Sequence, residues 1–324
     1  MSTAALPPLL ARGRAFWERH FVEPDRPAVA VEVRAGSVGV VRLVRSGTGV
    51  ALGAAALVEL PPGTLTISMS EPNLKDEAAF GRTLRSALDR AGVPSGARVA
   101  LVLPDPVARL ALVPAAEVSA KKREQVDELV RFKVLKSIPF DVKEARIAVV
   151  PGGSGSTLVA AVYRPVLEGY EAACRAQELT PGIVELTGPG LLTAAFGGLP
   201  PADRLLVNWD EGYLTLMLAR GAWPLVIRTI TGPPASSPTE VAREVANTVL
   251  YYRDRLSGSD LATAVIRSAW LPPAEAVALL EGPLGGPPAV LDCLAGLRGS
   301  EGAGSGVAAQ SLAGAMCCAR GTLA

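Results

Sequence analysis

Residues 27–44 constrain the fold more than any other segment of this chain. They contain two valine-rich runs on either side of a turn at Gly36 and Ser37. β-Branched side chains favour strands, and glycine adopts the backbone angles that tight turns need, so the segment predicts a β-hairpin. A third apolar run at residues 51–58 is followed by a Pro-Pro-Gly sequence, which extends the hairpin to a three-stranded meander.

The same pattern returns later in the sequence. Each meander is followed by a segment of helical periodicity, at residues 76–91 and 239–256, and Thr239 is the expected N-cap of the second helix. The second meander comprises residues 205–209, 213–218 and 224–230. A chain of 324 residues is long enough for two domains. The duplication therefore predicts two related α/β halves with a cleft between them.

Composition argues against several classes of function. The net charge is +1, so no overall field would attract nucleic acid. The only histidine is His20, and the four cysteines lack the spacing of metal ligands, which argues against a histidine-dependent triad and a metal site. No apolar stretch approaches the roughly 20 residues that span a bilayer, and no signal peptide is evident. We expect a cytoplasmic protein.

The N-terminal arm, residues 1–26, includes an amphipathic segment at residues 8–21. Its large apolar side chains share one arc of a predicted helix, and its arginines lie on the other side. Those apolar residues are Leu9, Leu10, Phe16, Trp17 and Phe21. A helix of this kind binds a membrane surface or docks on a protein. We favour docking on the chain's own body or on a partner, because the segment is short and Gly13 interrupts the apolar arc.

The region between the meanders predicts a small unit of its own. Residues 119–136 predict a helix with Ser119 as N-cap, ended by Ile-Pro-Phe at residues 138–140. Lysines and acidic residues alternate through residues 121–143. That segment is either a basic face for phospholipid or an acidic partner, or a solvated helix with paired charges.

The end of the chain is harder to interpret. Residues 271–306 are rich in proline and glycine, and within them we expect residues 299–306 to form a mobile loop. Residues 307–320 predict a final helix of small residues, suited to close packing.

The order of these segments resembles that of the type IV pilus assembly protein PilM family, within the actin/FtsA superfamily. The resemblance covers about residues 27–322 and includes Lys-Ser-Ile-Pro-Phe at residues 136–140. It implies an α/β, actin-like fold, which is a duplicated RNase H-like architecture, with a small inserted α+β subdomain. The implied parts are an arm at 1–26, a first half at 27–97 to which 164–202 and 307–324 return, an insert at 98–163 and a second half at 203–306.

The resemblance also locates the family's two phosphate loops, and this sequence departs from both. The first loop reads Gly-Leu-Asp-Ile-Gly-Ser-x-x-x-Lys, and here Glu32 stands at its Asp, Arg34 at its second Gly and Gly39 at its Lys. The second loop reads Asp-Ile-Gly, and here Asn208 and Asp210 replace its first and last residues. Close approach to phosphate needs small residues and free amides. We therefore expect no ATP turnover, no enzyme activity, no cofactor and no metal.

The family resemblance implies a structural role, as a cytoplasmic scaffold peripheral to the bacterial inner membrane. Its partner would be the cytoplasmic tail of a bitopic inner-membrane pilus assembly protein, bound between the first half and the insert, with an assembly ATPase as a further partner. Phe132, Leu135 and Phe140 are candidate walls of that site, or else core residues of the insert. A type II secretion platform protein would look similar.

Two other functions compete with the scaffold. One is an ATP-binding actin-like protein of the same family. The other is a small-molecule kinase on the same fold, which ranks last because we find no aspartate placed as a general base beside a phosphate loop.

Overall fold

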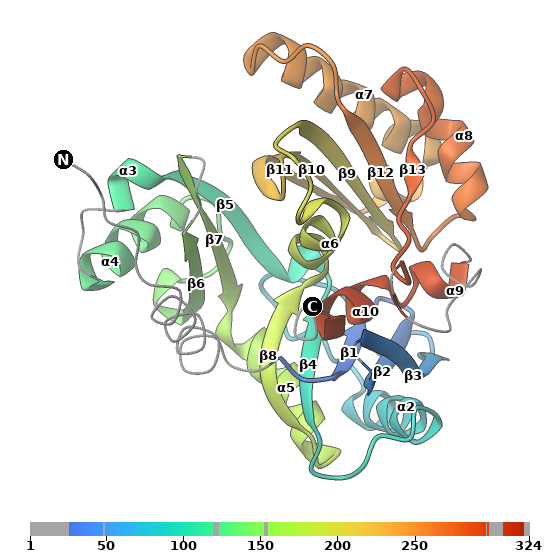
Figure 1. Ribbon diagram of the computed structural model, residues 1–324. Coiled ribbons are helices and arrows are strands. Elements are labelled where there is room, and N and C mark those ends of the chain that lie inside the picture. Colours follow the sequence, from blue (N-terminus) through green and yellow to red (C-terminus); the bar gives the residue numbers. More distant parts are fainter. Residues whose placement is uncertain are drawn as a thin grey trace, which may run out of the picture.

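The computed structural model describes residues 26–47, 49–118, 123–151, 155–295, 297 and 307–320. Figure 1 shows two α/β halves, one above the other, with a smaller three-stranded unit beside them. The predicted amphipathic segment, the predicted cap at Ser119 and the loop predicted at residues 299–306 lie outside the described residues.

The first half is built on a five-stranded sheet with the order β3-β2-β1-β4-β8. Its strands are β1 (Val29–Val33), β2 (Ser37–Ser46), β3 (Gly49–Glu59), β4 (Arg98–Leu103) and β8 (Thr180–Leu186). The predicted meander is confirmed as the antiparallel strands β1 to β3, and β4 and β8 run parallel to β1. Residues of β1 are buried along its whole length, as expected of a strand with both faces covered.

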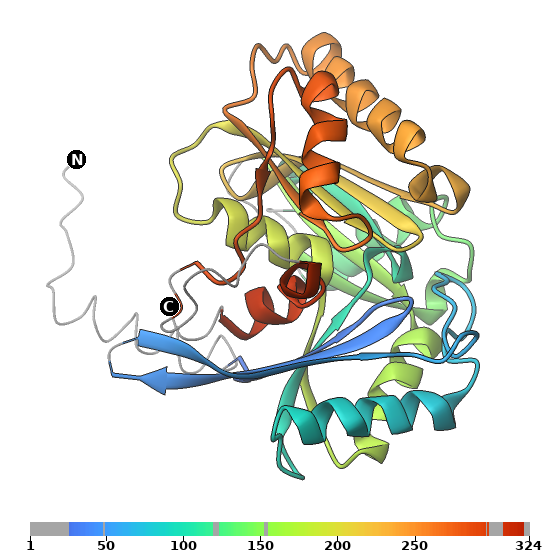
Figure 2. The same ribbon diagram turned by 90° about the vertical axis from the view of Figure 1, so that its right-hand side faces the viewer.

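Helices cover both faces of this sheet (Figure 2). One side is covered by α2 (Glu77–Arg90) and α5 (Arg164–Ala176), and the other by α10 (Ala313–Arg320). Asp76 caps α2 by accepting a hydrogen bond from the Ala79 amide at 2.8 Å, which satisfies one of the free amides of the first turn. The apolar stripe of α2 then lies against the sheet, with Phe80, Leu84 and Leu88 buried.

The second half repeats the first, which confirms the predicted duplication. Its sheet has the order β11-β10-β9-β12-β13, again an antiparallel meander followed by parallel strands. The strands are β9 (Asp203–Asp210), β10 (Tyr213–Arg220), β11 (Trp223–Thr231), β12 (Thr263–Ser268) and β13 (Ala289–Val290). The helices α7 (Pro238–Arg255) and α8 (Pro273–Leu284) pack on this sheet, and α6 (Thr187–Phe196) contacts β9, β10 and α10.

The insert is a three-stranded antiparallel sheet with its own small core. Its strands are β5 (Ala108–Pro114), β6 (Ala145–Pro151) and β7 (Ser156–Tyr163), in the order β5-β7-β6. The helix α4 (Arg123–Val134) packs on the sheet through Val130 and Val134, and α3 (Ala115–Val118) precedes it. The short helices that complete the structure are η2 (Asp105–Val107), η3 (Val142–Glu144), η4 (Pro233–Ser236) and α9 (Val307–Gln310).

Two predicted boundaries were wrong. The insert was expected to begin at residue 98, but residues 98–103 form β4, which pairs with β1 and β8 inside the first sheet. The local sequence pattern does not show which sheet a strand joins, because the strand's pairing partners are distant in sequence. The expected cap of α7 was Thr239, but Ser237 accepts from the Glu240 amide at 3.5 Å, and Pro238 occupies the first helical position.

Two helices near proline and glycine were not predicted. No helix was predicted in the proline- and glycine-rich residues 271–306, yet α8 begins there at Pro273, where a missing amide costs no intrahelical hydrogen bond. The helix α6 follows β8 directly and contains Gly188, Pro189 and Gly190, all poor helix formers in isolation. The predicted final helix is divided into α9 and α10.

Candidate functional site

The carboxyl ends of strands from both halves meet in the cleft between the two sheets. In open α/β sheets, ligands bind beyond such ends, so this is the first place to look for a site. The polar side chains found there are Glu32 and Arg34 at the end of β1, Asp105 after β4, Asn208 and Asp210 at the end of β9, and Arg267 in β12. Each of the six is at most 8% exposed.

Arg34 connects the first half to the second. Its Nε donates to both carboxylate oxygens of Asp210 at 3.1 Å, and its Nη2 donates to Oδ1 at 2.6 Å. The same Nη2 donates to the carbonyl oxygen of Ala269 at 2.9 Å. Arginine presents a planar set of donors, so this forked contact fixes the position of both groups.

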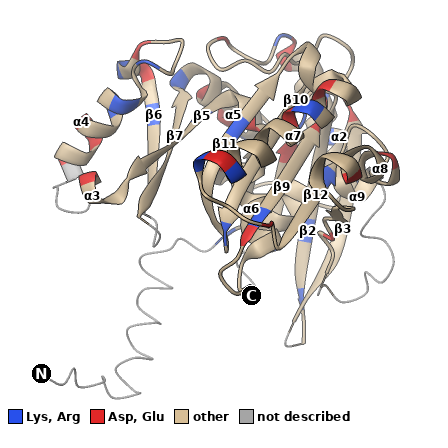
Figure 3. Cartoon of the chain, turned by 90° about the horizontal axis from the view of Figure 1, so that it is seen from above, with Lys and Arg blue, Asp and Glu red and all other residues tan. Residues whose placement is uncertain are grey.

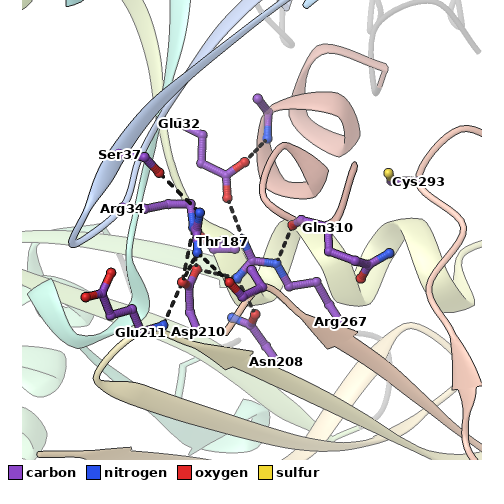
Figure 4. Close-up of polar contacts among 12 residues, drawn as sticks. Glu32, Arg34, Ser37, Thr187, Asn208, Asp210, Glu211, Arg267, Cys293 and Gln310 are labelled. Carbon is purple, nitrogen blue, oxygen red and sulfur yellow. Dashed lines mark hydrogen bonds and ion pairs between the residues drawn. The ribbon is translucent and has the colours of Figure 1, made fainter. Parts of the chain in front are cut away.

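Arg267 lies at the centre of the cluster, as Figure 4 shows, and is fully buried. Its Nη1 donates to Oδ2 of Asp210 at 2.5 Å and its Nη2 to Oε1 of Glu32 at 3.1 Å. It also contacts Oδ1 of Asn208 at 3.1 Å and the Gln310 carbonyl oxygen at 2.8 Å. Two guanidinium groups and two carboxylates thus form one buried ionic network across the cleft.

Glu32 and Asp105 each lie at a helix N-terminus. Oε2 of Glu32 accepts from the amide of Ala315 in α10 at 2.8 Å. Oδ1 of Asp105 accepts from the amide of Gly188 in α6 at 2.7 Å. A helix N-terminus attracts anions, phosphate among them, because its free amides and dipole present partial positive charge. Here each of these two termini has an anionic side chain of the protein itself against it.

Glycines make these contacts possible. A Cβ atom on Gly314 would lie 2.7 Å from Oε1 of Glu32, and one on Gly188 would lie 2.7 Å from Oδ2 of Asp105. Any larger residue would push the carboxylate away from the helix. Asp105 also accepts from Nδ2 of Asn208 at 3.0 Å, so the two halves are bridged a second time.

The direction of the pKa shift differs among the three carboxylates, Glu32, Asp105 and Asp210. Burial by itself would raise the pKa of Asp210, but the charges of Arg267 and Arg34 together outweigh burial and hold that pKa well below its usual value. Burial raises the pKa of Glu32, although Arg267 and the Ala315 amide oppose it. Burial likewise raises the pKa of Asp105 despite its bond from Gly188. Asp210 is therefore the group whose charge the network favours most.

The structure brings together the five predicted nucleotide-loop residues. Four join the polar cluster, and Gly39 lies opposite Glu32 in the β1–β2 pairing, where a Cβ atom would come within 2.6 Å of the Leu312 side chain. Sequence reasoning missed Arg267 and Asp105. A lone arginine inside the apolar run of β12 was the available clue, because a buried charge must have partners.

The second candidate site is a groove bordered by the first half, the insert and the β10–β11 turn of the second half, which we call the insert groove. Its cavity volume is about 790 Å³. Side chains from β7, β8, α6 and the β10–β11 turn line it, and most are apolar; the charged ones are Arg26, Glu185, Asp292 and Arg320. In the described sheets β8 pairs with β4 alone, so it is an edge strand.

The three predicted partner-binding residues do not line this cavity. Phe132 lies on α4 and Leu135 directly follows it, and they are 70% and 47% exposed. Phe140 is half-buried in the insert, with its ring 4.9 Å from that of Tyr163. Figure 3 shows both signs of charge on α4, and Lys133 pairs with Glu117 at 2.8 Å, which favours the solvated, charge-paired interpretation of the described part of this segment.

The duplicated halves and the insert define an actin-like α/β protein, as predicted. The chain is similar to a solved structure described as the "PilM-PilN type IV pilus biogenesis complex", with 18% identity, 93% of this chain and 100% of that chain covered, and a TM-score of 0.75. It is also similar to a Bacteroides thetaiotaomicron protein with an actin-like ATPase fold, at 8% identity, 91% and 98% coverage and a TM-score of 0.50.

A weaker similarity joins the chain to the cytoplasmic domain of EpsL, an inner membrane component of the type II secretion system of Vibrio cholerae. Identity is 13%, coverage is 74% of this chain and 81% of that domain, and the TM-score is 0.46. At these identities the likeness to solved structures establishes the fold and no more. No protein-family model matches the chain, and no curated protein matches it.

Two absences apply to the part of the chain that the structure describes. Within it, no three histidine, cysteine, aspartate or glutamate side chains gather as metal ligands would. None of the helices it contains is both long and apolar enough to cross a membrane.

Proposed function

We propose that this protein is a non-catalytic scaffold of a type IV pilus, or related type II secretion, assembly platform. It would lie in the cytoplasm against the inner membrane and bind the cytoplasmic tail of a membrane-anchored assembly protein. The observation that carries the proposal is the likeness to the PilM-PilN complex over 93% of this chain, with a TM-score of 0.75. An assembly ATPase is a further partner in this proposal.

The insert groove is the proposed binding site for the tail. The first half and the insert both contribute to it, as the family resemblance implies for a tail site, and its walls are mainly apolar. An extended peptide could add a strand to the edge of β8 and place alternate side chains in the cavity. Val184 and Leu186 of β8 and Leu158 of β7 would receive those side chains.

The cleft between the halves supports the non-catalytic part of the proposal. In an actin-like ATPase this cleft would hold the nucleotide phosphates. Here Glu32 and Asp105 lie on the helix N-termini that would attract phosphate, and Asp210 adds a third carboxylate. A nucleotide would have to displace these groups and leave Arg34 and Arg267 without their partners, at a cost of several kcal/mol.

The tail-binding proposal can be tested by fluorescence anisotropy with a labelled peptide of the partner's cytoplasmic tail. Ala194 is exposed on α6 and lines the groove, so Ala194→Glu should weaken binding at least tenfold, about 1.4 kcal/mol. Ala78 is equally exposed on α2, outside the groove, and Ala78→Glu is the matched control. Equal affinity in the two variants would exclude the groove as the site.

The nucleotide part is tested separately by thermal unfolding. A ligand at about 100 times its dissociation constant adds roughly 2.7 kcal/mol of stability. We expect millimolar Mg-ATP to leave the melting temperature unchanged. A clear rise would instead support the alternative of an ATP-binding actin-like protein, and phosphate release above background would contradict the non-catalytic role.

A further inference from the structure

We propose that the N-terminal arm of this chain occupies the insert groove in the free protein, so that a partner tail must displace it. The occupant is the chain's own segment at residues 8–21. The docking itself is independent of the proposed function, and only the competition with a partner rests on it.

The first argument is where the described chain begins. Arg26 lines the groove and forms an ion pair with Glu185 of β8, which also lines it. The residues that precede Arg26 therefore start from the groove wall. Phe21 is five residues away and Trp17 nine. An extended chain spans at most about 3.6 Å per residue, so these side chains start within about 18 and 32 Å of Arg26.

The second argument is chemical complementarity. The arm has five large apolar residues on one arc of its predicted helix. The groove is lined by apolar side chains from several elements, among them Leu158, Val184, Leu192 and Trp223. A cavity of about 790 Å³ lies in the range of pockets that enclose ligands as large as a few side chains. The four charged residues at the groove, two of each sign, suit a segment that carries both arginines and glutamate.

The third argument is tethering. Only residues 22–25 separate the segment from Arg26, and a segment tethered through so few residues acts at an effective concentration in the millimolar range. An arm whose free peptide bound with a dissociation constant below that range would then fill the groove for most of the time. The apparent affinity for a partner tail equals the intrinsic affinity multiplied by the fraction of molecules in which the groove is open, which makes the arm a built-in regulator of partner binding.

Disulfide trapping in the full chain tests the docking directly. In a Cys317→Ser background, which removes the half-buried groove cysteine, Trp17→Cys is combined with Ala194→Cys in the groove or with the matched control Ala78→Cys on α2. Both alanines are exposed, so neither change affects packing. We expect an intrachain disulfide with Ala194→Cys at a rate at least tenfold above that with Ala78→Cys.

Every other result overturns the proposal. Equal rates for the two pairs would show that the arm does not prefer the groove. A disulfide between two chains, visible as a covalent dimer, would place the arm on a second copy instead.

Hydrogen exchange provides a second test with native cysteines. Replacing Phe16, Trp17 and Phe21 by serine should speed amide exchange in β7 and α6 at least threefold, while Arg12→Ser with Arg14→Ser should not. Unchanged exchange would contradict docking in the groove. If the serine variant instead loses sedimentation with anionic phospholipid vesicles and exchange is unchanged, the arm is a membrane anchor. None of these measurements contains a partner, so their failure leaves the tail-binding proposal untouched.

Discussion

The two spaces in this molecule have opposite character. The cleft between the halves is filled by an ionic network in which Arg267 and Asp210 are at most 1% exposed. The insert groove is open, mostly apolar and about 790 Å³ in volume. The cleft is thus closed by the chain's own charges, while the groove keeps room for another chain.

The difference follows from how charge behaves in each place. A buried charge without a partner is so costly that four groups in the cleft must hold one another. Removing Arg267 would leave Glu32 without an ion-pair partner, and removing Asp210 would leave Arg34 without one. Apolar side chains need no charged partner. The groove can therefore exist empty or filled, and the free-energy cost of leaving it empty is set by the apolar area exposed to water.

The largest expected effect is the loss of Arg267. Arg267→Ala leaves Glu32 and Asp210 buried without their shared counterion and should lower the free energy of unfolding by about 3–5 kcal/mol. Urea unfolding measures this loss of unfolding free energy. The control is Arg175→Ala, which removes an exposed pair with Glu171 within one helix and should cost about 0.3–0.5 kcal/mol. Similar losses in the two variants would mean that the cleft network contributes no special stability.

A smaller loss of stability should distinguish the two carboxylates that contact Arg267, Asp210 and Glu32. At pH 7, Asp210→Asn should destabilise more than Glu32→Gln, because the network holds the pKa of Asp210 below its usual value while burial raises the pKa of Glu32. Both amides keep the shape of the acid, so chemical denaturation of the pair compares charge alone. The reverse order would contradict the assignment of Asp210 as the central anion.

The dependence of stability on pH provides a third comparison. A carboxyl whose pKa is lower in the folded state stabilises the protein above its unfolded pKa, about 3.9 for aspartate, and loses that contribution as pH falls. The free energy of unfolding should therefore decrease below about pH 4. The Asp210→Asn variant should lack the part of this decrease in unfolding free energy that comes from protonation of Asp210. Parallel curves for the two proteins between pH 3 and 6 would contradict it.

The smallest effect concerns α4. Phe132 and Leu135 are exposed, so replacing either by alanine should change stability by no more than about 0.5 kcal/mol. Their role as anchors for the partner tail stays a prediction. A loss of about 1–3 kcal/mol in tail binding would confirm it. Unchanged affinity, together with weak binding by Ala194→Glu, would confine the site to the insert groove.

Much of the fold could be predicted from local pattern. The two meanders, the helices α2, α5 and α7 and the strands of the insert follow from runs of apolar residues and the turns between them. The helices α6 and α8 could not, because tertiary packing overrides the low helix propensity of their glycines and prolines. The same holds for β4, whose place in the first sheet is set by pairing with β1 and β8.

The sequence by itself predicted changed phosphate loops, because Glu32, Arg34, Gly39, Asn208 and Asp210 differ from the pattern of the family that the chain resembles. Only the tertiary structure decided what replaced them. Arg34 and Asp210 are 176 positions apart, and Arg267 and Glu32 are 235 apart. Ion pairs of this kind depend on distances of about 3 Å between groups from different strands. No spacing along the chain encodes such distances, so the network, like the insert groove, exists only once the two sheets and the insert are packed.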